Sequence, residues 1–575
     1  MAELPNTNVQ EPEQTNLQKE QFDTGMSDED LLAQIIEWEK ESETFYEVLK
    51  RVWDINVRYY RGLQTDVDLI VGTGSKTVEN RIWMATETMV PIATSRLPDI
   101  VVKSGDEDEQ SQQDAMDLQD VLGFHMERVR IQEKAERFIR NMIVKRYGVF
   151  KVAWNKKIDD VGLEEIDPKR IRVPRFGKDV KSLAFIIQEL ELSYEQAKRF
   201  FGEGKAKVLL EMGFQEGVQD TFHGPSAEPN KVQPDSNKQR RKTFTVKEVW
   251  TNDFVAWKAG TEILKSQKNP FFNFTNKKKN YFDVPRKPFI IKSLFQVGES
   301  ILGETDYVQQ LISVQDNINI RKRQVEDIAG KVANPVLLID SDVMSEEQAA
   351  NITNEAGLII FGKDAAKGDK FRFESPGNVP NYLFADLETS RTQFDNIWGI
   401  HSTTRGEREG KETLGGRQLL RAADLGRVDL VARQLERALD EIAEYWTQLI
   451  KMFYNEKKTF SILGEDGTRF IQNFSGAKIG ENVKPMVTAG STLPKDEVSI
   501  RQEAIQLWQL GAIGIRTLYK ALKMPNISEA IDDFAKTQQG QAGASPEVGG
   551  GTPTLPPQVK CHTKKEQREN NASSK

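Results

Sequence analysis

The chain has 575 residues, which exceeds a single compact domain of ordinary size and predicts three or four domains. Lysine and arginine number 79 against 87 aspartate and glutamate residues, so the net charge of −8 excludes a histone-like polycation. One cysteine, Cys561, excludes an intramolecular disulfide and a thiolate zinc cluster. The opening segment lacks a basic start followed by an apolar run, and no stretch of about 20 apolar residues occurs, so we expect neither a secretory signal nor a membrane span.

The first third predicts helices with one short strand. Residues 1–27 are polar and predict a disordered arm. Ser27 and Asp30 have capping-box spacing, and apolar residues then recur at helical spacing until Gly62. A second helix is expected after Asn80, interrupted at Pro91.

The following segment predicts a strand, a loop and a helix. We expect the strand at 100–102 and an acidic loop over 104–114. One long helix should follow and continue to about Tyr147.

The middle third predicts mixed α/β structure, because alternating residues replace the helical pattern at Gly148. One helix is expected at 193–201. Strands are expected at 149–154, 164–168, 170–174, 183–192, 244–251, 253–260 and 288–295.

The last part turns helical again. The helix at 305–332 is unusually polar and carries only a thin apolar stripe, which is typical of a helix that packs against neighbours. A small insert with strands at 334–340 and 357–362 separates it from a second helix at 381–398. We further expect a charged loop at 401–416, the longest helix after it, a strand pair formed by 459–474 and 483–489, two or three helices within 496–536, and a disordered tail from 538.

The sequence carries no signature of catalysis. The segment 68–77 looks like a phosphate loop, but Ser75 and Ile70 stand where the Walker pattern needs glycine, so a flexible surface turn is the better interpretation. His125 is interpreted as a half-buried helix residue, and His401 has no second ligand at metal spacing. We therefore expect no enzyme activity, no cofactor and no metal.

A basic and aromatic stretch at 269–288 allows two interpretations. It interleaves three lysines at 277–279, Arg286 and Lys287 with aromatic residues, as nucleic-acid patches do. A solvated hairpin with an apolar underside accounts for the same pattern and is the interpretation we favour.

Several motifs in a fixed order resemble the portal proteins of tailed bacteriophages, which connect head and tail. The resemblance covers about 28–535, although Pro174 stands where the family often has aspartate. The motifs are RYYRGLQ (58–64), NRIWMATETMVPIATSRLPDIVV (80–102), KRYGVFKVAWN (145–155), IDPKRIRVPRFGKD (166–179), VKEVWT (246–251), the Asn-Pro at 269–270 and GESILGETDYVQQLISVQDNIN (298–319).

The resemblance implies an α+β portal fold, with a mainly helical stem and crown, a mixed α/β wing and a small β-containing clip, assembled as a ring, usually of twelve copies. Twelve copies would carry a charge of about −96, which suits a conduit that must not grip DNA phosphates. The implied boundaries are an arm at 1–27, wing at 28–300, stem helix at 301–331, clip at 332–378, second stem helix at 379–400, tunnel loop at 401–416, long wing helix at 417–455, wing return strands at 456–493, crown at 494–537 and tail at 538–575.

The resemblance also implies partners and DNA-facing residues. In the tunnel loop, Arg405, Arg408 and Lys411 are candidates for contact with passing DNA, although their alternation with glutamates also fits a plain solvated loop. In the stem, the candidates are Arg321, Lys322 and Arg323. Implied partners are further copies of the chain, double-stranded DNA in the channel, the terminase large subunit, the major capsid and scaffolding proteins, and head–tail adaptor or tail proteins, with no membrane. The implied location is a capsid vertex of the virion, with assembly in the host cytoplasm.

Two other classes of function remain open on the sequence alone. A tail adaptor is usually much shorter, and a scaffold-like protein would lack the β-rich middle third. A DNA-acting enzyme would need a metal or phosphate site that the sequence does not display.

Overall fold

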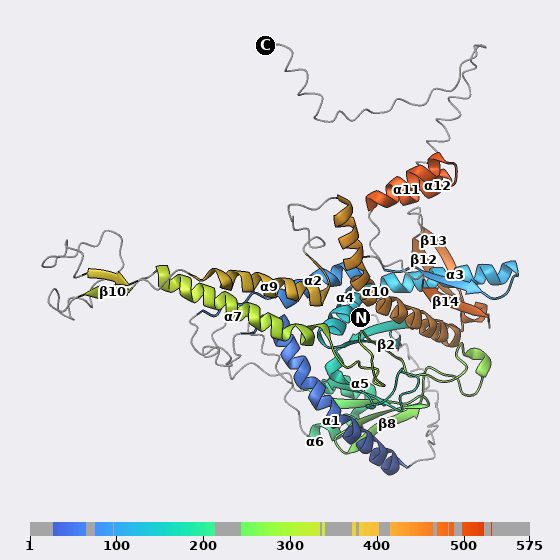
Figure 1. Cartoon of the computed structure of the whole chain (residues 1–575). Coiled ribbons are helices and arrows are strands. Elements are labelled where there is room, and N and C mark those ends of the chain that lie inside the picture. The colour runs from blue at the N-terminus through green and yellow to red at the C-terminus, as the bar shows by residue number, and fades with distance from the viewer. Residues whose placement is uncertain are drawn as a thin grey trace, which may run out of the picture. The chain divides into compact units, whose positions relative to one another are not determined.

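The computed structural model describes residues 27–64, 75–95, 97–212, 243–333, 336–339, 371–374, 379–401, 414–463, 469–480, 482–487, 497–522 and 531 (Figure 1). The chain divides into two compact units. Unit 1 comprises Met1–Ile462 and Phe470–Pro494, and unit 2 comprises Leu463–Arg469 and Lys495–Lys575. Helices and several small sheets together confirm the α+β class. Of the expected disordered segment at 1–27, residues 1–26 lie outside the described residues, as do the tail from 538 and Cys561.

Helix α1 (Asp28–Tyr60) begins where the sequence predicts, because the Ser27 hydroxyl accepts a hydrogen bond from the Asp30 backbone N–H. It ends just before Gly62, which has a φ of 79°. Helix α2 (Arg81–Thr94) begins after Asn80, whose side chain accepts from the Trp83 backbone N–H. The expected interruption at Pro91 is wrong, since the helix continues to Thr94; a proline so near the end removes only one late hydrogen bond.

The expected single helix before Tyr147 is two helices, α3 (Glu109–Arg128) and α4 (Ile131–Val144). The break lies at Arg130, whose φ of 52° is left-handed and reverses the chain. The acidic loop is also shorter than expected, because the Asp108 carboxylate accepts from the Ser111 N–H and starts α3 at Glu109.

Two antiparallel sheets form the mixed part of unit 1. Strands β2 (Tyr147–Asn155), β3 (Asp160–Ile166) and β9 (Phe289–Ser293) lie in the order β3-β2-β9. A five-stranded sheet follows the chain order through β4 (Ile171–Arg172), β5 (Ile186–Leu192), β6 (Phe244–Trp250), β7 (Phe254–Ala259) and β8 (Glu262–Lys268). The polar β8 and the helix α6 (Glu203–Glu211), which follows α5 (Tyr194–Phe201), were not expected from the sequence pattern.

The largest core joins α4, the β2 sheet and the long helix α10 (Leu414–Phe453). Phe138 stacks on Phe150 with ring centroids 4.3 Å apart. A Cβ at Gly148 would lie 2.6 Å from Phe138, so this close approach requires the glycine at which the sequence pattern changes.

The strands after α10 pair differently from the prediction. Strands β12 (Lys458–Leu463) and β13 (Arg469–Phe474) pair with each other, whereas β14 (Val483–Val487) pairs antiparallel with β1 (Ile100–Ser104). The expected pairing of 459–474 with 483–489 is therefore wrong, because β14 pairs with a strand about 380 positions earlier, beyond the reach of local patterning. In unit 2, the described helices are α11 (Glu497–Gln509) and α12 (Ile515–Ala521).

Candidate functional site: the α7–α9 arm

Two long helices lie side by side and carry a strand pair at their far end, an arrangement we call the arm (Figure 1). Helix α7 (Tyr307–Ala333) has 27 residues, which is about 40 Å at 1.5 Å per residue. Strands β10 (Val336–Ile339) and β11 (Phe371–Glu374) pair antiparallel, and α9 (Asn381–Trp398) returns alongside α7. The predicted bounds of α9 are confirmed, β11 was not expected, and the strand expected at 357–362 lies outside the described residues.

Apolar packing explains why the two helices of the arm pair. The buried stripe of α7 consists of Val308, Leu311, Val314 and Ile318, and that of α9 of Leu383, Leu387, Phe394 and Trp398. These residues recur at helical spacing, so each helix presents one apolar side. Tyr307 and Trp398 meet where α7 begins and α9 ends, with ring centroids 4.7 Å apart.

The polar side of α7 binds the backbone of another segment of the same subunit. Gln315 and Asn319 are one helical turn apart and are buried. The Gln315 side chain donates to the Glu79 carbonyl (2.7 Å) and accepts from the Arg81 N–H (3.1 Å), and Asn319 Oδ1 accepts from the Glu79 N–H (3.0 Å). Asn319 Nδ2 also donates to Gln64 Oε1 (2.6 Å). These amides add to the bond that the Arg81 N–H already makes to the Glu79 carbonyl (2.8 Å), and Asn319 gives the Glu79 N–H its acceptor.

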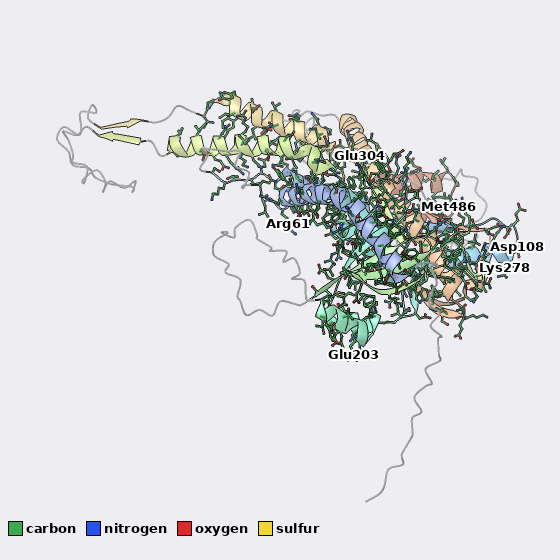
Figure 2. All side chains as sticks on the ribbon, turned by 90° about the horizontal axis from the view of Figure 1, so that it is seen from below. Arg61, Asp108, Glu203, Lys278, Glu304 and Met486 are labelled. Carbon is green, nitrogen blue, oxygen red and sulfur yellow. The ribbon has the colours of Figure 1, made fainter. Side chains whose placement is uncertain are left out.

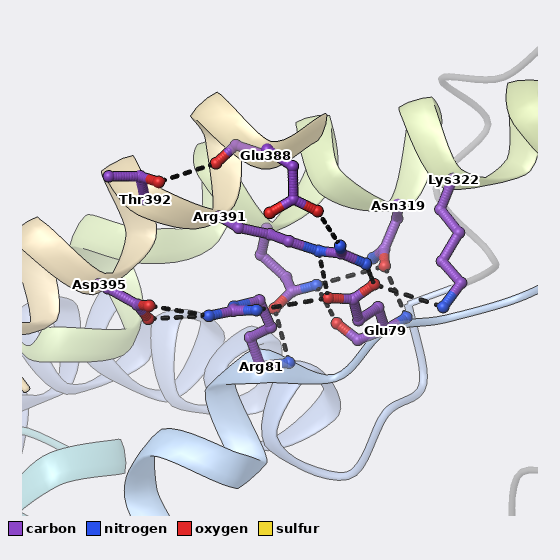
Figure 3. A network of polar contacts seen from close by, with 9 residues as sticks. Glu79, Arg81, Asn319, Lys322, Glu388, Arg391, Thr392 and Asp395 are labelled. Atoms are coloured by element: carbon purple, nitrogen blue, oxygen red, sulfur yellow. Dashed lines mark hydrogen bonds and ion pairs between the residues drawn. The ribbon is translucent and has the colours of Figure 1, made fainter. Parts of the chain in front are cut away.

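Ion pairs join the same segment to both helices of the arm (Figure 3). The Glu79 carboxylate accepts from Arg391 Nε (2.9 Å) and Nη2 (2.5 Å) on α9 and from Lys322 Nζ (3.3 Å) on α7. Arg81 Nη2 donates to both carboxylate oxygens of Asp395 at 2.9 and 3.0 Å. The segment 79–81 is thus fixed to α7 through amides and a lysine, and to α9 through two arginine–carboxylate pairs.

The charges of this cluster are mutually stabilised. Burial alone would raise the pKa of Glu79, but the hydrogen bonds and charges of Arg391 and Lys322 outweigh it and hold the pKa below its usual range. Glu79 is therefore an anion at neutral pH. Removing its charge would leave Arg391 with only the exposed Glu388 as a carboxylate partner among the described residues.

The three stem residues singled out from the sequence all have partners within the subunit. Arg321 Nε donates to Asp386 on α9 at 2.5 Å, and Lys322 pairs with Glu79. Arg323 is only 4% exposed and its Nε donates to the Thr77 carbonyl at 2.9 Å. Their channel-lining role stays a prediction, while the polarity that suggested it is largely explained by contacts inside one subunit.

The end of the phosphate-loop look-alike is bound to α7. The Ser75 N–H donates to Asp327 Oδ1 (2.8 Å) and its hydroxyl donates to Glu326 Oε2 (2.6 Å). Carboxylates thus occupy the donors that a phosphate would need, which argues against nucleotide binding at 75–77. Within the expected flexible turn, Ser75 is bound to α7, and the Thr77 carbonyl accepts from Arg323 of the same helix. Residues 65–74 lie outside the described residues.

The outer surface of α9 exposes two aromatic side chains. Tyr382 is 67% exposed and Phe384 is 47% exposed. Both belong to the half of α9 nearest β11, and exposed aromatic groups of this kind are typical of protein interfaces.

The proposed DNA-contacting residues of the tunnel loop, Arg405, Arg408 and Lys411, lie outside the described residues. The residue at which the loop starts is fixed by α10. The His401 N–H donates to Asp424 Oδ2 (2.9 Å), and His401 Nδ1 lies 2.8 Å from Asp424 Oδ1.

The remaining histidine prediction needs correction. His125 is fully buried rather than half-buried, and its Nε2 lies 3.0 Å from the Tyr454 hydroxyl, which also donates to Asp160. Burial lowers the pKa of His125 to about 4. Across the residues that the structure describes, no group of three or more His, Cys, Asp or Glu side chains could hold a metal ion.

The basic stretch at 269–288 is neither a hairpin nor a continuous basic surface. It contains a short 3-10 helix, Lys277–Lys279, and no strand, because asparagine side chains bind its backbone instead. Arg286 stacks on Phe282 at 3.8 Å and pairs with Glu444, and Lys287 is buried. Only the lysines at 277–279 remain outside, as Lys278 shows in Figure 2.

Sequence reasoning missed the residues that hold the arm to segment 79–81. Glu79, Arg391 and Asp395 drew no attention, and Gln315 and Asn319 were noted only as polar. One signal was present: Gln315 with Asn319, and Arg391 with Asp395, are each spaced by four, so each pair shares a helix face.

Comparison with known proteins finds one family model that matches part of the chain. Residues 254–501, which include β8, β9, the arm and α10, match the family model described as Phage P22-like portal protein. No curated protein matches the sequence. The family match confirms the resemblance drawn from the sequence motifs. None of the helices in the described ranges is long and apolar enough to cross a membrane.

Proposed function

We propose that this chain, a phage portal protein by the match of residues 254–501 to the P22-like portal family, forms a ring of twelve copies at one capsid vertex. In this proposal the ring is the conduit for genome packaging and later ejection. Portal proteins are structural rather than enzymatic. The ring would assemble in the host cytoplasm and remain in the virion.

The arm is the observation that carries the proposal. A helix pair with a small strand pair at its far end suits a stem that ends in a clip. We assign 301–331 and 379–400 to the stem and 332–378 to the clip, where the terminase large subunit and later the head–tail adaptor or tail proteins would dock. Segment 79–81 supports this assignment, because it fixes both helices of the arm to α2 and would let the stem move with the wing.

The other assignments follow the family order. We propose a wing at 28–300 with return strands at 456–493 and the long helix at 417–455, a tunnel loop at 401–416 and a crown at 494–537. The antiparallel pairing of β1 with β14 supports placing 483–487 with the wing. Contacts with the major capsid and scaffolding proteins would use the wing.

The channel would be acidic overall with few basic contacts. Each subunit has a net charge of −8, so double-stranded DNA would slide without being held tightly. We propose that Arg321 and Lys322, which are partly exposed, and Arg405, Arg408 and Lys411 of the tunnel loop supply the contacts with passing DNA. Among the three stem candidates, Arg323 is the least accessible.

An interface test examines the role of the arm in assembly. The double variant Tyr382→Asp and Phe384→Asp places charges on the exposed part of α9, and we expect it to stop ring formation while leaving the subunit folded. Phe200→Asp is the matched control, because Phe200 is 69% exposed on α5, outside the arm. Native mass spectrometry would show rings for the wild type and the control only. Rings of unchanged abundance in the double variant would contradict an interface at α9.

A further inference from the structure

Four segments of unit 1 that are distant in sequence bring nine lysines to one surface, and nothing in the portal assignment uses it. We call these segments the lysine surface: the turn 155–159 between β2 and β3, strand β8, residues 269–284 of the basic stretch, and residues 455–458 between α10 and β12. The lysines are Lys156, Lys157, Lys265, Lys268, Lys277, Lys278, Lys279, Lys457 and Lys458.

Side-chain contacts join three of the four segments. Lys458 Nζ lies 3.0 Å from Asp159 Oδ2, and this ion pair joins 455–458 to the turn between β2 and β3. Lys279 Nζ donates to Asn455 Oδ1 (3.4 Å), which joins the short helix Lys277–Lys279 to 455–458. Residues from three parts of the chain therefore lie against one another.

Strand β8 belongs to the same surface. Lys268 Nζ lies 5.8 Å from the centre of the Phe274 ring, so the end of β8 contacts the basic stretch. Lys265 lies near Lys156 of the turn between β2 and β3. Burial lowers the pKa of Lys265, and the charge of Lys156 lowers it further, which is the effect of two cations held close together.

The lysine surface is basic although the whole chain is acidic. Its segments contain nine lysines and only four carboxylates, Asp159, Glu262, Asp283 and Glu456, whereas the chain has a net charge of −8. Seven of the lysines are exposed and have no ion pair among the described residues: Lys156, Lys157, Lys265, Lys277, Lys278, Lys279 and Lys457. Their charges are therefore available to a ligand.

The composition of the lysine surface favours a nucleic acid over a protein as its ligand. Lysine is depleted at protein–protein interfaces, whereas lysine side chains neutralise phosphates in sequence-independent DNA binding. Asn155, Thr275 and Asn276 are exposed between the lysines, and such side chains also contact phosphate oxygens. The four segments contain no arginine, which is the cation that most often reads base edges. The expected contacts are therefore with the DNA backbone.

We propose that the lysine surface binds the phosphate backbone of double-stranded DNA, at a site separate from the stem and tunnel-loop residues assigned to the channel. Lysines from at least two of the four segments contact the same duplex, and the binding is independent of base sequence. In the portal assignment, this DNA would be a part of the genome that is not passing through the ring.

A gel mobility-shift titration of the full-length protein tests the proposal. The probe is relaxed, closed-circular duplex DNA, which has no free end and cannot be threaded through a closed ring. We expect binding at about 50 mM salt that weakens steeply as the salt concentration rises. Lys277→Gln with Lys278→Gln should bind about tenfold more weakly, and the slope of log affinity against log salt concentration should become shallower by about one to two.

A second variant tests whether separate segments form one binding surface. Lys156→Gln with Lys157→Gln changes the turn between β2 and β3, and we expect it to weaken binding by about tenfold as well. The matched control is Lys50→Gln with Arg51→Gln, because both residues are exposed on α1, outside the lysine surface. Its affinity for the circular DNA should change by less than about twofold.

Four results would overturn the proposal. These are no binding of the circular DNA at low salt, unchanged affinity in either lysine variant, a loss in the α1 control equal to that in the lysine variants, and displacement of the DNA by oligoglutamate at a lower charge concentration than by a duplex oligonucleotide. The last result would assign the surface to an acidic protein instead. Native mass spectrometry of the same variants reports ring formation separately, so a failure of DNA binding and a failure of the ring proposal are distinguishable.

Discussion

Replacing Glu79 with Gln tests how the arm is anchored. The substitution keeps the side-chain shape and the backbone bonds to Gln315 and Asn319, but it removes the charge that faces Arg391 and Lys322. Breaking a buried ion pair costs about 3–5 kcal/mol. Because the side chains of Glu79 and Arg391 are 18% and 26% exposed, we expect a smaller loss of about 2–3 kcal/mol.

Hydrogen exchange measured by mass spectrometry gives the most local assay of this loss. A loss of about 2–3 kcal/mol corresponds to exchange about 30–150-fold faster, since each 1.4 kcal/mol is tenfold. We expect this acceleration in peptides that contain 75–81 and the part of α9 around Arg391, and no change in β5 to β7.

The pH dependence of the Glu79→Gln effect has a definite sign. The pKa of Glu79 is held below its usual range in the folded protein, so its stabilising effect is present above the unfolded pKa of about 4.3. It is lost as the pH falls through the folded pKa. The difference between the wild type and the variant should therefore be largest at neutral pH and shrink below about pH 4.

The matched control is Glu388→Gln, because Glu388 contacts the same arginine from an exposed position. Its side chain is 67% exposed, so the loss should stay below about 1 kcal/mol. Equal acceleration of exchange in the two variants, or no acceleration in Glu79→Gln, would refute the anchoring role of Glu79.

The remaining predictions concern stability and are measured by urea or thermal unfolding. The pKa of His125 is about 4 in the folded protein, so on acidification the unfolded chain binds the proton first. The free energy of unfolding of the wild type should therefore fall by about 3 kcal/mol between about pH 6.5 and pH 4, and that of His125→Gln should fall by less. An equal dependence of this free energy on pH in the two proteins would contradict the prediction. Gly476→Ala should destabilise by about 1–3 kcal/mol, since its Cβ would lie 2.6 Å from the Ile450 carbonyl oxygen. Gly426→Ala should have the opposite effect, because Gly426 lies within α10 and an added Cβ would meet open space. We expect the free energy of unfolding to rise by about 0.5–1 kcal/mol, and a decrease would contradict the prediction.

Helix boundaries were the most predictable part of the fold, because their signals are local. The caps at Ser27 and Asn80 and both ends of α9 agree with the sequence pattern. The break at Arg130 was not predicted, since a left-handed arginine leaves no mark in the apolar periodicity. Strand pairing was predicted least well: β14 pairs with β1, and no local pattern contains that information.

The α7–α9 site also depends on contacts between distant segments, which local sequence patterns do not predict. The polarity of α7 was predicted from the sequence, but it was interpreted through packing against neighbours and contact of Arg321, Lys322 and Arg323 with DNA. Gln315 and Asn319 instead bind the backbone near Glu79, about 240 positions away. Sequence patterns report which side of a helix is polar, whereas only the fold shows which distant segment uses it.

Negative-stain electron microscopy of the purified full-length protein, combined with native mass measurement, tests the central claim most directly. The proposed portal function predicts closed rings of about twelve subunits with a central hole, the stoichiometry at which the acidic subunits would enclose a channel for DNA. A compact dimer, or a filled particle without a channel, would contradict the account.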